Sequence, residues 1–177
     1  TILSEGFCRH SLKEKTAVEM RYDNGAVRRQ DRLLSEERAV ELLQKGEYGF
    51  LAMASAEGGY GVPINYAVKG DTIYMHCAPE GAKLRAIAND ERVMFCVVGQ
   101  RRVVPAEFTT MYESVMAQGS ARLVDTEAER REALRLIVEK YSPEHCKEGM
   151  AAIERSISRT AVIAIDVMCL TGKQKSR

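Results

Sequence analysis

A series of short β-type runs, joined by tight turn signals, occupies the middle of the chain and most restricts its fold. The runs lie between residues 48 and 124 and read "YGFLAMAS", "GYGVPINYAV", "DTIYMHC", "RVMFCVV" and "SVMAQGSARLV". Breaks at residues 57–59 and 69–71 separate neighbouring runs, and the second, Lys-Gly-Asp, is typical of a hairpin turn. Strands joined by tight turns pair in antiparallel fashion, and in a chain of 177 residues such a sheet usually closes into a barrel.

Helical patterns flank these runs. The first helix is predicted to begin after Ser35, whose hydroxyl can accept a hydrogen bond from the first turn, and to end at a left-handed Gly46. A later helix has capping-box spacing at Thr126 and Glu129 and ends before Pro143. A shorter helix over residues 150–157 leads to a last strand, "TAVIAIDVMCLTGK". The predicted fold class is therefore α+β, an antiparallel β-barrel with flanking helices.

The chain is predicted to form one domain after an N-terminal extension. Residues 1–25 are polar without sustained periodicity and are predicted to be a tail or arm, and residues 26–177 form the domain. The apolar runs, such as Ala161–Ile165, are too short to span a bilayer, and no signal-peptide pattern is present, so a cytoplasmic protein is expected. The formal net charge of +1 gives no general attraction to nucleic acid or to a membrane, and neither partner is expected.

The five cysteines are scattered and form no Cys-x-x-Cys pair. His76-Cys77 and His145-Cys146 are adjacent pairs, whereas zinc sites favour ligands that are spaced apart. Reduced thiols that pack as small apolar side chains are the simpler interpretation, and no metal site is predicted.

The stretch "IYMHCAPEGAKLRAI", residues 73–87, passes from a strand into a helix. A helix N-terminus presents unpaired N–H groups; Gly81 lets a ligand approach the backbone, and Lys83 adds a full positive charge, so a phosphate would fit. Alternation along the strand predicts that His76 points away from Met75 and Cys77. The residues alone leave two alternatives open: a solvated lysine, and a histidine that is a hydrogen-bonded packing residue.

Four motifs follow one another along the chain. They are Gly-Val-Pro-x-Asn-Tyr at Gly61–Tyr66, Ile-Tyr-x-His-x-Ala at Ile73–Ala78, Gly-x-Lys at Gly81–Lys83, and Phe-Thr-Thr-x-Tyr-Glu-Ser-Val at Phe108–Val115. This order resembles the pyridoxamine-phosphate-oxidase-like superfamily and, within it, the nitroimidazole-reductase (Nim) type. The likeness extends over roughly residues 28–173, through "GSARLV", "REALRLIVEKYSPE" and "RTAVIAID".

The resemblance implies a split β-barrel that forms a homodimer, with one FMN in each of two clefts at the subunit interface. Carried over to this sequence, the residues along the isoalloxazine and ribityl chain are Val62, Pro63, Ile64, Asn65 and Tyr66. The remaining cofactor contacts are His76 and Cys77 beside the flavin, Lys83 at the FMN phosphate, and Ser114 from a later strand.

The same resemblance implies an FMN-dependent oxidoreductase that passes electrons to a small aromatic acceptor such as a nitroimidazole. A reduced nicotinamide is a candidate electron donor, although the sequence does not identify the donor, and His76 is the expected catalytic residue, as a proton donor or a substrate contact near the ring. Pyridoxamine phosphate oxidation is not expected, because Ala82 precedes Lys83 where those oxidases pair an arginine with the lysine, and because the chain has no Trp. Two alternatives stay open: a flavin carrier or sensor without turnover, and a haem-binding split-barrel relative.

Overall fold

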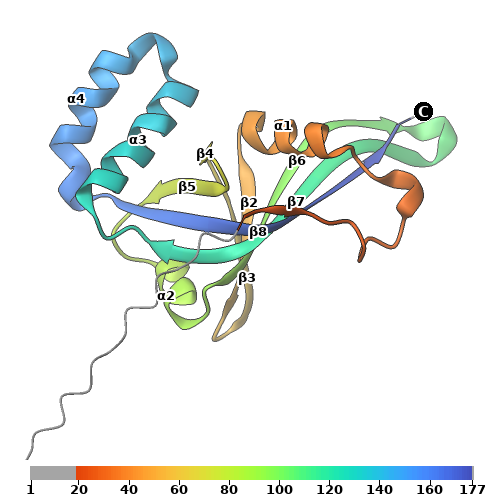
Figure 1. Ribbon diagram of the computed structural model, residues 1–177, viewed down its shortest axis with the longest axis horizontal. Coiled ribbons are helices and arrows are strands. Elements are labelled where there is room, and N and C mark those ends of the chain that lie inside the picture. Colours follow the sequence, from red (N-terminus) through yellow and green to blue (C-terminus); the bar gives the residue numbers. More distant parts are fainter. Residues whose placement is uncertain (1–18, 177) are drawn as a thin grey trace, which may run out of the picture.

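The computed structural model of the chain describes residues 19–176, which fold around one long, twisted sheet (Figure 1). The strands are β1 (Arg21–Tyr22), β2 (Gly49–Ser55), β3 (Gly58–Ile64), β4 (Ala67–Lys69), β5 (Thr72–Cys77), β6 (Arg92–Val104), β7 (Thr109–Leu123) and β8 (Ala161–Lys175). The α-helices are α1 (Glu36–Lys45), α2 (Ala82–Asn89), α3 (Glu127–Tyr141) and α4 (Cys146–Ser156).

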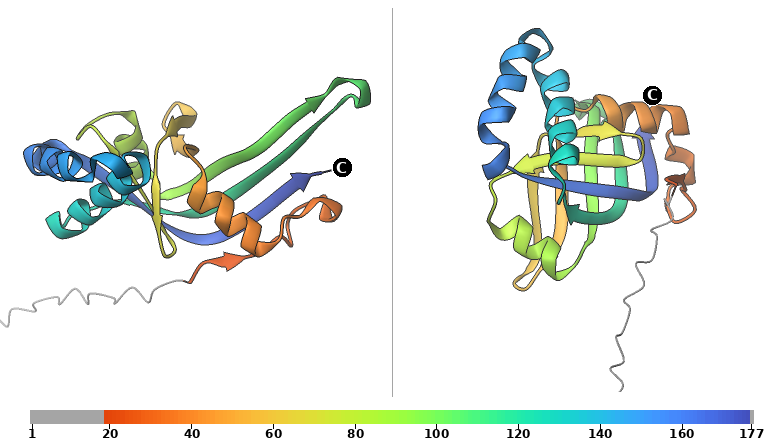
Figure 2. Two further views of the ribbon diagram at one scale, coloured as in Figure 1. Left: turned by 90° about the horizontal axis from the view of Figure 1, so that it is seen from above. Right: turned by 60° about the vertical axis from the view of Figure 1, so that its left-hand side comes forward.

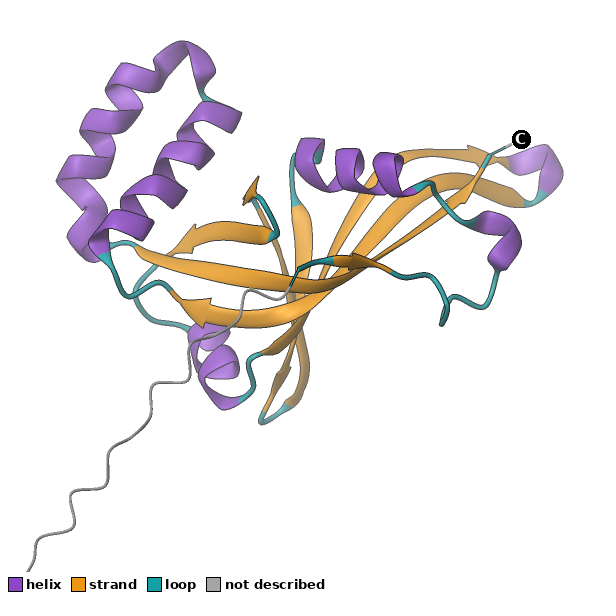
Figure 3. Ribbon diagram, viewed as in Figure 1, coloured by secondary structure: helices purple, strands orange, loops and turns teal. Residues whose placement is uncertain are grey.

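The strands form a single sheet in the order β3-β2-β6-β7-β8-β5-β4, in which every neighbouring pair is antiparallel. β1 adds to β8 in parallel orientation. Within residues 19–176 the path does not close, because β3 and β4 at its two ends do not pair with each other. The helices lie around the strands and do not alternate with them (Figure 3). The predicted α+β fold, an antiparallel split β-barrel with flanking helices, is confirmed.

β6 and β7 form a long ribbon that extends beyond the apolar runs of the sequence (Figure 2, left). β6 continues to Val104, β7 already begins at Thr109, and the chain turns between them through a 3-10 turn at Pro105–Glu107. Polar residues such as Arg101 and Thr110 occupy this extension. It is held by strand pairing, so hydrophobic alternation gives no signal for it.

The run "GYGVPINYAV" is divided into β3 and β4 by a corner at Asn65 and Tyr66. The Tyr66 ring is fully buried in the core, and its backbone N–H donates to the Tyr141 hydroxyl at 3.0 Å in place of a strand partner. The prediction of one continuous run was wrong, because strand pairing stops at this corner, where the Tyr66 ring is buried and its N–H bonds to a helix residue.

The main core lies inside the curled sheet. Leu51, Phe95 and Val115 are fully buried there, each on the inward face of its strand. Two helices cover the open sides of this core. They contribute Ala39, Leu42 and Leu43 from α1, and Ala86 and Ile87 from α2. Burying one large apolar side chain contributes about 1.5–3 kcal/mol, so these stripes fix both helices to the sheet.

α1 begins as predicted but ends differently. The Ser35 Oγ accepts a hydrogen bond from the Arg38 N–H at 3.2 Å, which confirms the predicted cap. Gly46 follows the helix, but its φ of −58° is ordinary, so the predicted left-handed conformation was wrong. The glycine is needed for space: a Cβ here would lie 2.5 Å from Val97 and 2.7 Å from the Tyr66 hydroxyl.

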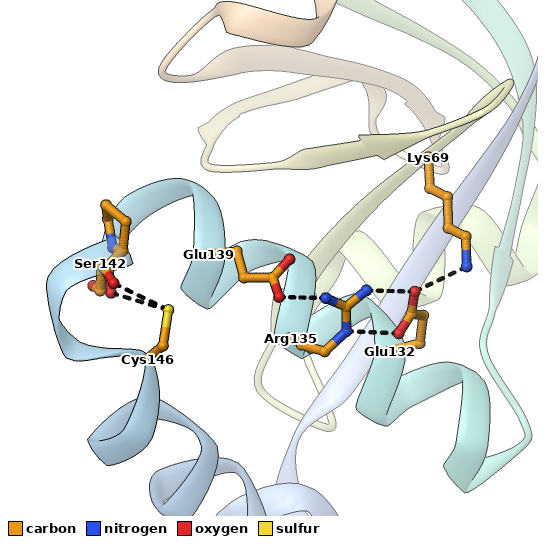
Figure 4. Close-up of polar contacts among 7 residues, drawn as sticks. Lys69, Glu132, Arg135, Glu139, Ser142 and Cys146 are labelled. Atoms are coloured by element: carbon orange, nitrogen blue, oxygen red, sulfur yellow. Dashed lines mark hydrogen bonds and ion pairs between the residues drawn. The ribbon is translucent and has the colours of Figure 1, made fainter.

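α3 and α4 form a helical hairpin over β4, β5 and β8, outside the main core (Figure 2, right). A second apolar cluster attaches this hairpin, in which Leu134 packs with Tyr74. Lys69 of β4 pairs with Glu132 at 2.8 Å, and Arg135 binds the same carboxylate (Figure 4). Exposed ion pairs contribute about 0–1 kcal/mol each, so the apolar cluster provides most of the attachment.

The described part of the N-terminal segment is joined to the sheet. Of the predicted tail, residues 1–25, residues 1–18 lie outside the described residues. Arg21 and Tyr22 pair with Cys169 and Leu170 of β8, and the Tyr22 hydroxyl donates to the Leu34 carbonyl at 2.7 Å. Residues 21–22 are therefore part of the folded sheet.

Candidate functional site

The N-terminus of α2 has an unusual arrangement of charge. Gly81 precedes it with φ 139° and ψ 175°, a conformation that is essentially restricted to glycine. Within the described part of the chain, no side chain caps the first turn and no acidic residue lies in it. Lys83, half-buried, occupies that turn. Unpaired N–H groups and an ammonium group both favour an anion at this position.

Cys77, at the end of β5, lies close enough to Lys83 for the two to interact electrostatically. Burial raises the pKa of the Cys77 thiol, and the nearby ammonium offsets part of that increase. The thiol is therefore protonated at neutral pH, and it packs against the main core. The arrangement brings Cys77 and Lys83 together, with the cysteine acting as a small apolar side chain.

His76 lies on the outer face of β5, opposite to Met75 and Cys77, as strand alternation predicts. Met75 is fully buried in the main core, whereas the His76 side chain is exposed. The protein around it still removes part of its hydration, which lowers the pKa of His76 below the ordinary histidine value. Within residues 19–176 the imidazole forms no hydrogen bond, so it is available to a ligand.

β3 forms one edge of the sheet, so backbone groups on its free side have no strand partner among the described residues. Val62 and Ile64 pack against the main core, whereas Pro63 is exposed on the other face. Asn65 is also exposed, and its Nδ2 donates to the Glu47 carbonyl at 3.2 Å. A flat polar ring could lie along this edge and exchange hydrogen bonds with the backbone.

Tyr66 has a structural role. Its hydroxyl donates to the Leu43 carbonyl at 2.5 Å, and its ring meets Phe95 edge-on with the centroids 4.8 Å apart. Burial raises the pKa of the phenol. The side chain points into the main core, and both backbone groups of Tyr66 lie within hydrogen-bond distance of the Tyr141 hydroxyl, so the structure gives Tyr66 a role in the core and not the predicted flavin contact.

Ser114 lies apart from the other predicted residues. It is half-buried on β7, opposite Val98 on β6 and Lys173 on β8. Two strands, β2 and β6, separate β7 from β3. Because neighbouring strands are about 4.8 Å apart, Ser114 is roughly 14 Å from β3 along the sheet. Within one chain, Ser114 and β3 therefore do not form one compact site.

The end of α3 supports the corner after β3. The Tyr141 hydroxyl donates to the Glu47 carbonyl at 2.5 Å and accepts from the Tyr66 N–H. The Lys140 Nζ is buried 3.9 Å from the Tyr66 ring centroid without a hydrogen-bond partner in the described residues, and burial lowers its pKa to about 8. The sequence places Tyr141 on the apolar face of α3 and gives no signal for these contacts.

No group of three or more His, Cys, Asp or Glu side chains within residues 19–176 is arranged to hold a metal ion. Across the same residues, none of the helices combines the length and apolar character needed to cross a membrane.

Comparisons with known proteins agree with this architecture. A family model described as pyridoxamine 5'-phosphate oxidase matches residues 35–174. No curated protein sequence matches the chain. Among solved structures, a candidate 5-nitroimidazole antibiotic resistance protein from Bacteroides thetaiotaomicron is similar, with a TM-score of 0.67 and 22% identity over 81% of this chain and 86% of that one.

Two further solved structures are from flavin-binding proteins. The FAD- and haem-binding protein from Mycobacterium smegmatis has a TM-score of 0.71 and 19% identity, over 81% of this chain and 72% of that one. An FAD-binding protein from Mesorhizobium loti has a TM-score of 0.57 and 20% identity, over 82% of this chain and 97% of that one. At these identities the likenesses show the fold. Because the family model matches most of the sequence, we conclude that the chain belongs to the pyridoxamine 5'-phosphate oxidase family.

Proposed function

We propose that this chain is a flavoprotein that binds FMN as a homodimer and reduces a small aromatic nitro compound. The observation that carries the proposal is the start of α2, where an uncapped first turn and Lys83 lie beside the end of β5. FMN has a phosphate at one end and a flat ring system at the other. The helix start would hold the phosphate, and the edge strand β3 would hold the ring.

The residues present fit the phosphate end. A Cβ at Gly81 would meet no atom within 4 Å, so the space beside the first turn is open. A hollow of about 300 Å³ lies between the β2–β3 hairpin and α2, lined by residues that include Tyr60, Ala82 and Arg85. Open space, free N–H groups and the Lys83 ammonium together support phosphate binding at this helix start.

A homodimer would cover exposed apolar surface and complete the site. Phe50, Val98 and Met116 are 47%, 58% and 37% exposed on β2, β6 and β7. Strand register places Phe50 and Met116 in one cross-strand row with Pro63. Ser114 lies beside Val98, so it would reach a flavin held at β3 only from the partner subunit. A two-fold contact through this face would bring both sets of residues to each flavin.

Sedimentation tests the dimer. At micromolar concentration the flavin-loaded protein should sediment as a dimer, and Phe50→Asp should yield a monomer that has lost most of its flavin, because a charge would be buried without a partner. Glu57→Ala, at an exposed turn, is the control and should remain dimeric. A wild-type monomer that keeps its flavin would contradict this part of the proposal.

The bound flavin would supply the redox chemistry, taking electrons from a reduced nicotinamide and passing them to the nitro compound. The chain would hold the cofactor and exclude water through Lys83 and the β3 backbone. His76 would donate a proton to the acceptor. Because burial lowers the pKa of His76, less of the imidazolium form is present at a given pH than for an ordinary histidine, and the rate should fall as pH rises through that lowered pKa.

Turnover assays with a reduced nicotinamide and a 5-nitroimidazole test the activity. The flavin-loaded wild type should turn over, and His76→Ala should slow the reaction by about 10²-fold while it keeps its flavin and melting temperature. His145→Ala is a matched control, since His145 is also exposed. A flavin-loaded wild type without turnover would favour a carrier or sensor. An unchanged rate in His76→Ala would exclude the proton-donor role.

Haem binding is a second candidate, favoured by the likeness to the FAD- and haem-binding protein of Mycobacterium smegmatis. An absorption spectrum of the purified protein separates the two. Flavin bands support the first proposal, and a Soret band supports the second.

A further inference from the structure

The Tyr141 hydroxyl takes the place of a backbone pair between β2 and β3. Pairing of these strands ends at Gly49 and Ile64. If the same register continued, Glu47 would lie opposite Tyr66. Instead, the Tyr141 oxygen lies 2.5 Å from the Glu47 carbonyl oxygen and 2.9 Å from the Tyr66 carbonyl oxygen, and it accepts from the Tyr66 N–H at 3.0 Å. One side chain from the end of α3 therefore joins the two strand ends.

The same bridge determines how the Asn65 amide is oriented. The Asn65 Nδ2 donates to the Glu47 carbonyl at 3.2 Å, so Asn65 and Tyr141 share this carbonyl. Because a carbonyl only accepts hydrogen bonds, the amide turns its nitrogen toward Glu47 and leaves its oxygen free. Among the described residues, no donor is bonded to the Asn65 Oδ1, and Asn65 is exposed. The result is a fixed acceptor beside the end of β3.

Asn65 is the side chain best placed to bind a polar ring along this edge. Val62 and Ile64 pack against the main core, so the other face of β3 is formed by the residues between them. On that face Gly61 has no side chain and Pro63 has no N–H. Asn65 follows two positions later with a free amide oxygen, which is complementary to an N–H group at the edge of a flat ring.

We propose that Tyr141 is a positioning residue for the flavin ring and that it acts through Asn65. This role rests on the proposed binding of the ring along β3. The Tyr141 side chain is anchored in α3, so its hydroxyl holds the Glu47 carbonyl in one place, and this carbonyl holds the Asn65 amide. An acceptor that is already oriented loses less conformational entropy when the ligand binds. Lys83 would set affinity for the phosphate, and Tyr141 would set affinity for the ring.

Fluorescence titrations of the flavin-free full chain with FMN and with riboflavin test this role. Tyr141→Phe should weaken binding of both ligands by at least ~5-fold, the scale of one lost hydrogen bond. Both affinities should fall by the same factor, because the two ligands share the ring. The ratio of FMN to riboflavin affinity should therefore stay at its wild-type value, whereas Lys83→Ala should reduce it. Wild-type affinity for both ligands in Tyr141→Phe would overturn the proposal.

Tyr74→Phe is the matched control. The Tyr74 hydroxyl also joins the sheet to α3, by donating to Glu129 at 3.1 Å, and across residues 19–176 it has no hydrogen bond to β2 or β3. Both variants should melt somewhat below the wild type, because each loses a hydroxyl contact. Only Tyr141→Phe should lose flavin affinity. Equal losses of affinity in the two variants would overturn the positioning role, because attachment of α3 alone would then explain the effect.

A double-mutant cycle tests whether Tyr141 acts through Asn65. Asn65→Ala should also weaken binding of both FMN and riboflavin. The double variant with Tyr141→Phe should lose little more affinity than Asn65→Ala alone, since the two changes remove one linked set of contacts. Independent losses that multiply would overturn the proposal. A wild type that binds neither ligand would refute the proposed function and this role together, whereas wild-type binding with an unchanged Tyr141→Phe would refute only this role.

Discussion

The helices α2 and α3 begin in opposite ways. At the start of α3, the Thr126 hydroxyl accepts a hydrogen bond from the Glu129 N–H, and Glu127 and Glu129 suit the positive end of the helix dipole. At the start of α2, Gly81 provides no cap, the first turn has no acid, and Lys83 adds positive charge where the dipole disfavours it. The α3 start is complete by itself. The α2 start has no such partner among the described residues, and under our proposal an external anion would supply it.

The largest effect is expected from the loss of Lys83 at the start of α2, and it should appear in FMN affinity. Lys83→Ala should weaken FMN binding by about one to two decades, because one charge-assisted contact to phosphate is lost, about 1.5–3 kcal/mol. The flavin-free protein should melt no earlier than the wild type, since a charge unfavourable to the dipole is removed. Fluorescence titration measures the first effect and thermal unfolding the second. Lys147→Ala, at an exposed position of α4, is the control.

Gly81→Ala should affect both the backbone and the ligand. A methyl group at this position has open space but the wrong dihedral angles, so the free energy of unfolding should fall by about 1–3 kcal/mol. FMN affinity should fall as well, since the first turn must shift. Gly59→Ala is the matched control, because its Cβ also meets no atom within 4 Å and its φ is not positive. Chemical denaturation measures the free energy of unfolding of each variant. An equal decrease in Gly81→Ala and Gly59→Ala would contradict this account.

Thr126→Ala should affect only stability. Loss of the cap should lower the free energy of unfolding by about 1 kcal/mol, as measured by urea denaturation, and should leave FMN affinity unchanged. Thr126→Ser retains a hydroxyl acceptor, so its free energy of unfolding should stay close to that of the wild type. A clear change in FMN affinity in Thr126→Ala would show that the two helix starts are not independent.

The smallest effect is expected at the other end of α3. Burial lowers the pKa of Lys140 to about 8, below the ordinary value for lysine of about 10.4. Between these two pH values the unfolded chain binds more protons, so the free energy of unfolding should rise with pH over this window. Lys140→Met should remove that rise and stabilise the protein at pH 7 by under about 1 kcal/mol. Unfolding titrations from pH 7 to 10 test this, with the exposed Lys147→Met as control.

Features that depend on neighbouring residues could be predicted from the sequence. The hydroxyl caps at Ser35 and Thr126 are both present, and the turn between β4 and β5 has Gly70 at a φ of 56°. The outward position of His76 follows from alternation along one strand. Each of these rests on the chemistry of a few adjacent residues, which the sequence displays directly.

Features that depend on distant contacts could not be predicted. The polar half of the β6–β7 ribbon exists because Arg101–Val104 pair with Thr109–Tyr112, and pairing of this kind leaves no apolar alternation. The corner at Tyr66 depends on Tyr141, from a helix far along the chain. For the site, local motifs indicate Lys83, but only the strand order reveals how far Ser114 lies from β3.

The most direct test of the central claim compares FMN with riboflavin, which lacks the phosphate. If the α2 start holds the phosphate, the wild type should bind FMN at least ~10-fold more tightly than riboflavin, and this ratio should shrink at high ionic strength and in Lys83→Ala. Fluorescence titration of the flavin-free protein with each ligand measures the ratio. Equal affinities for FMN and riboflavin in the wild type would contradict the claim that this helix start is a phosphate site.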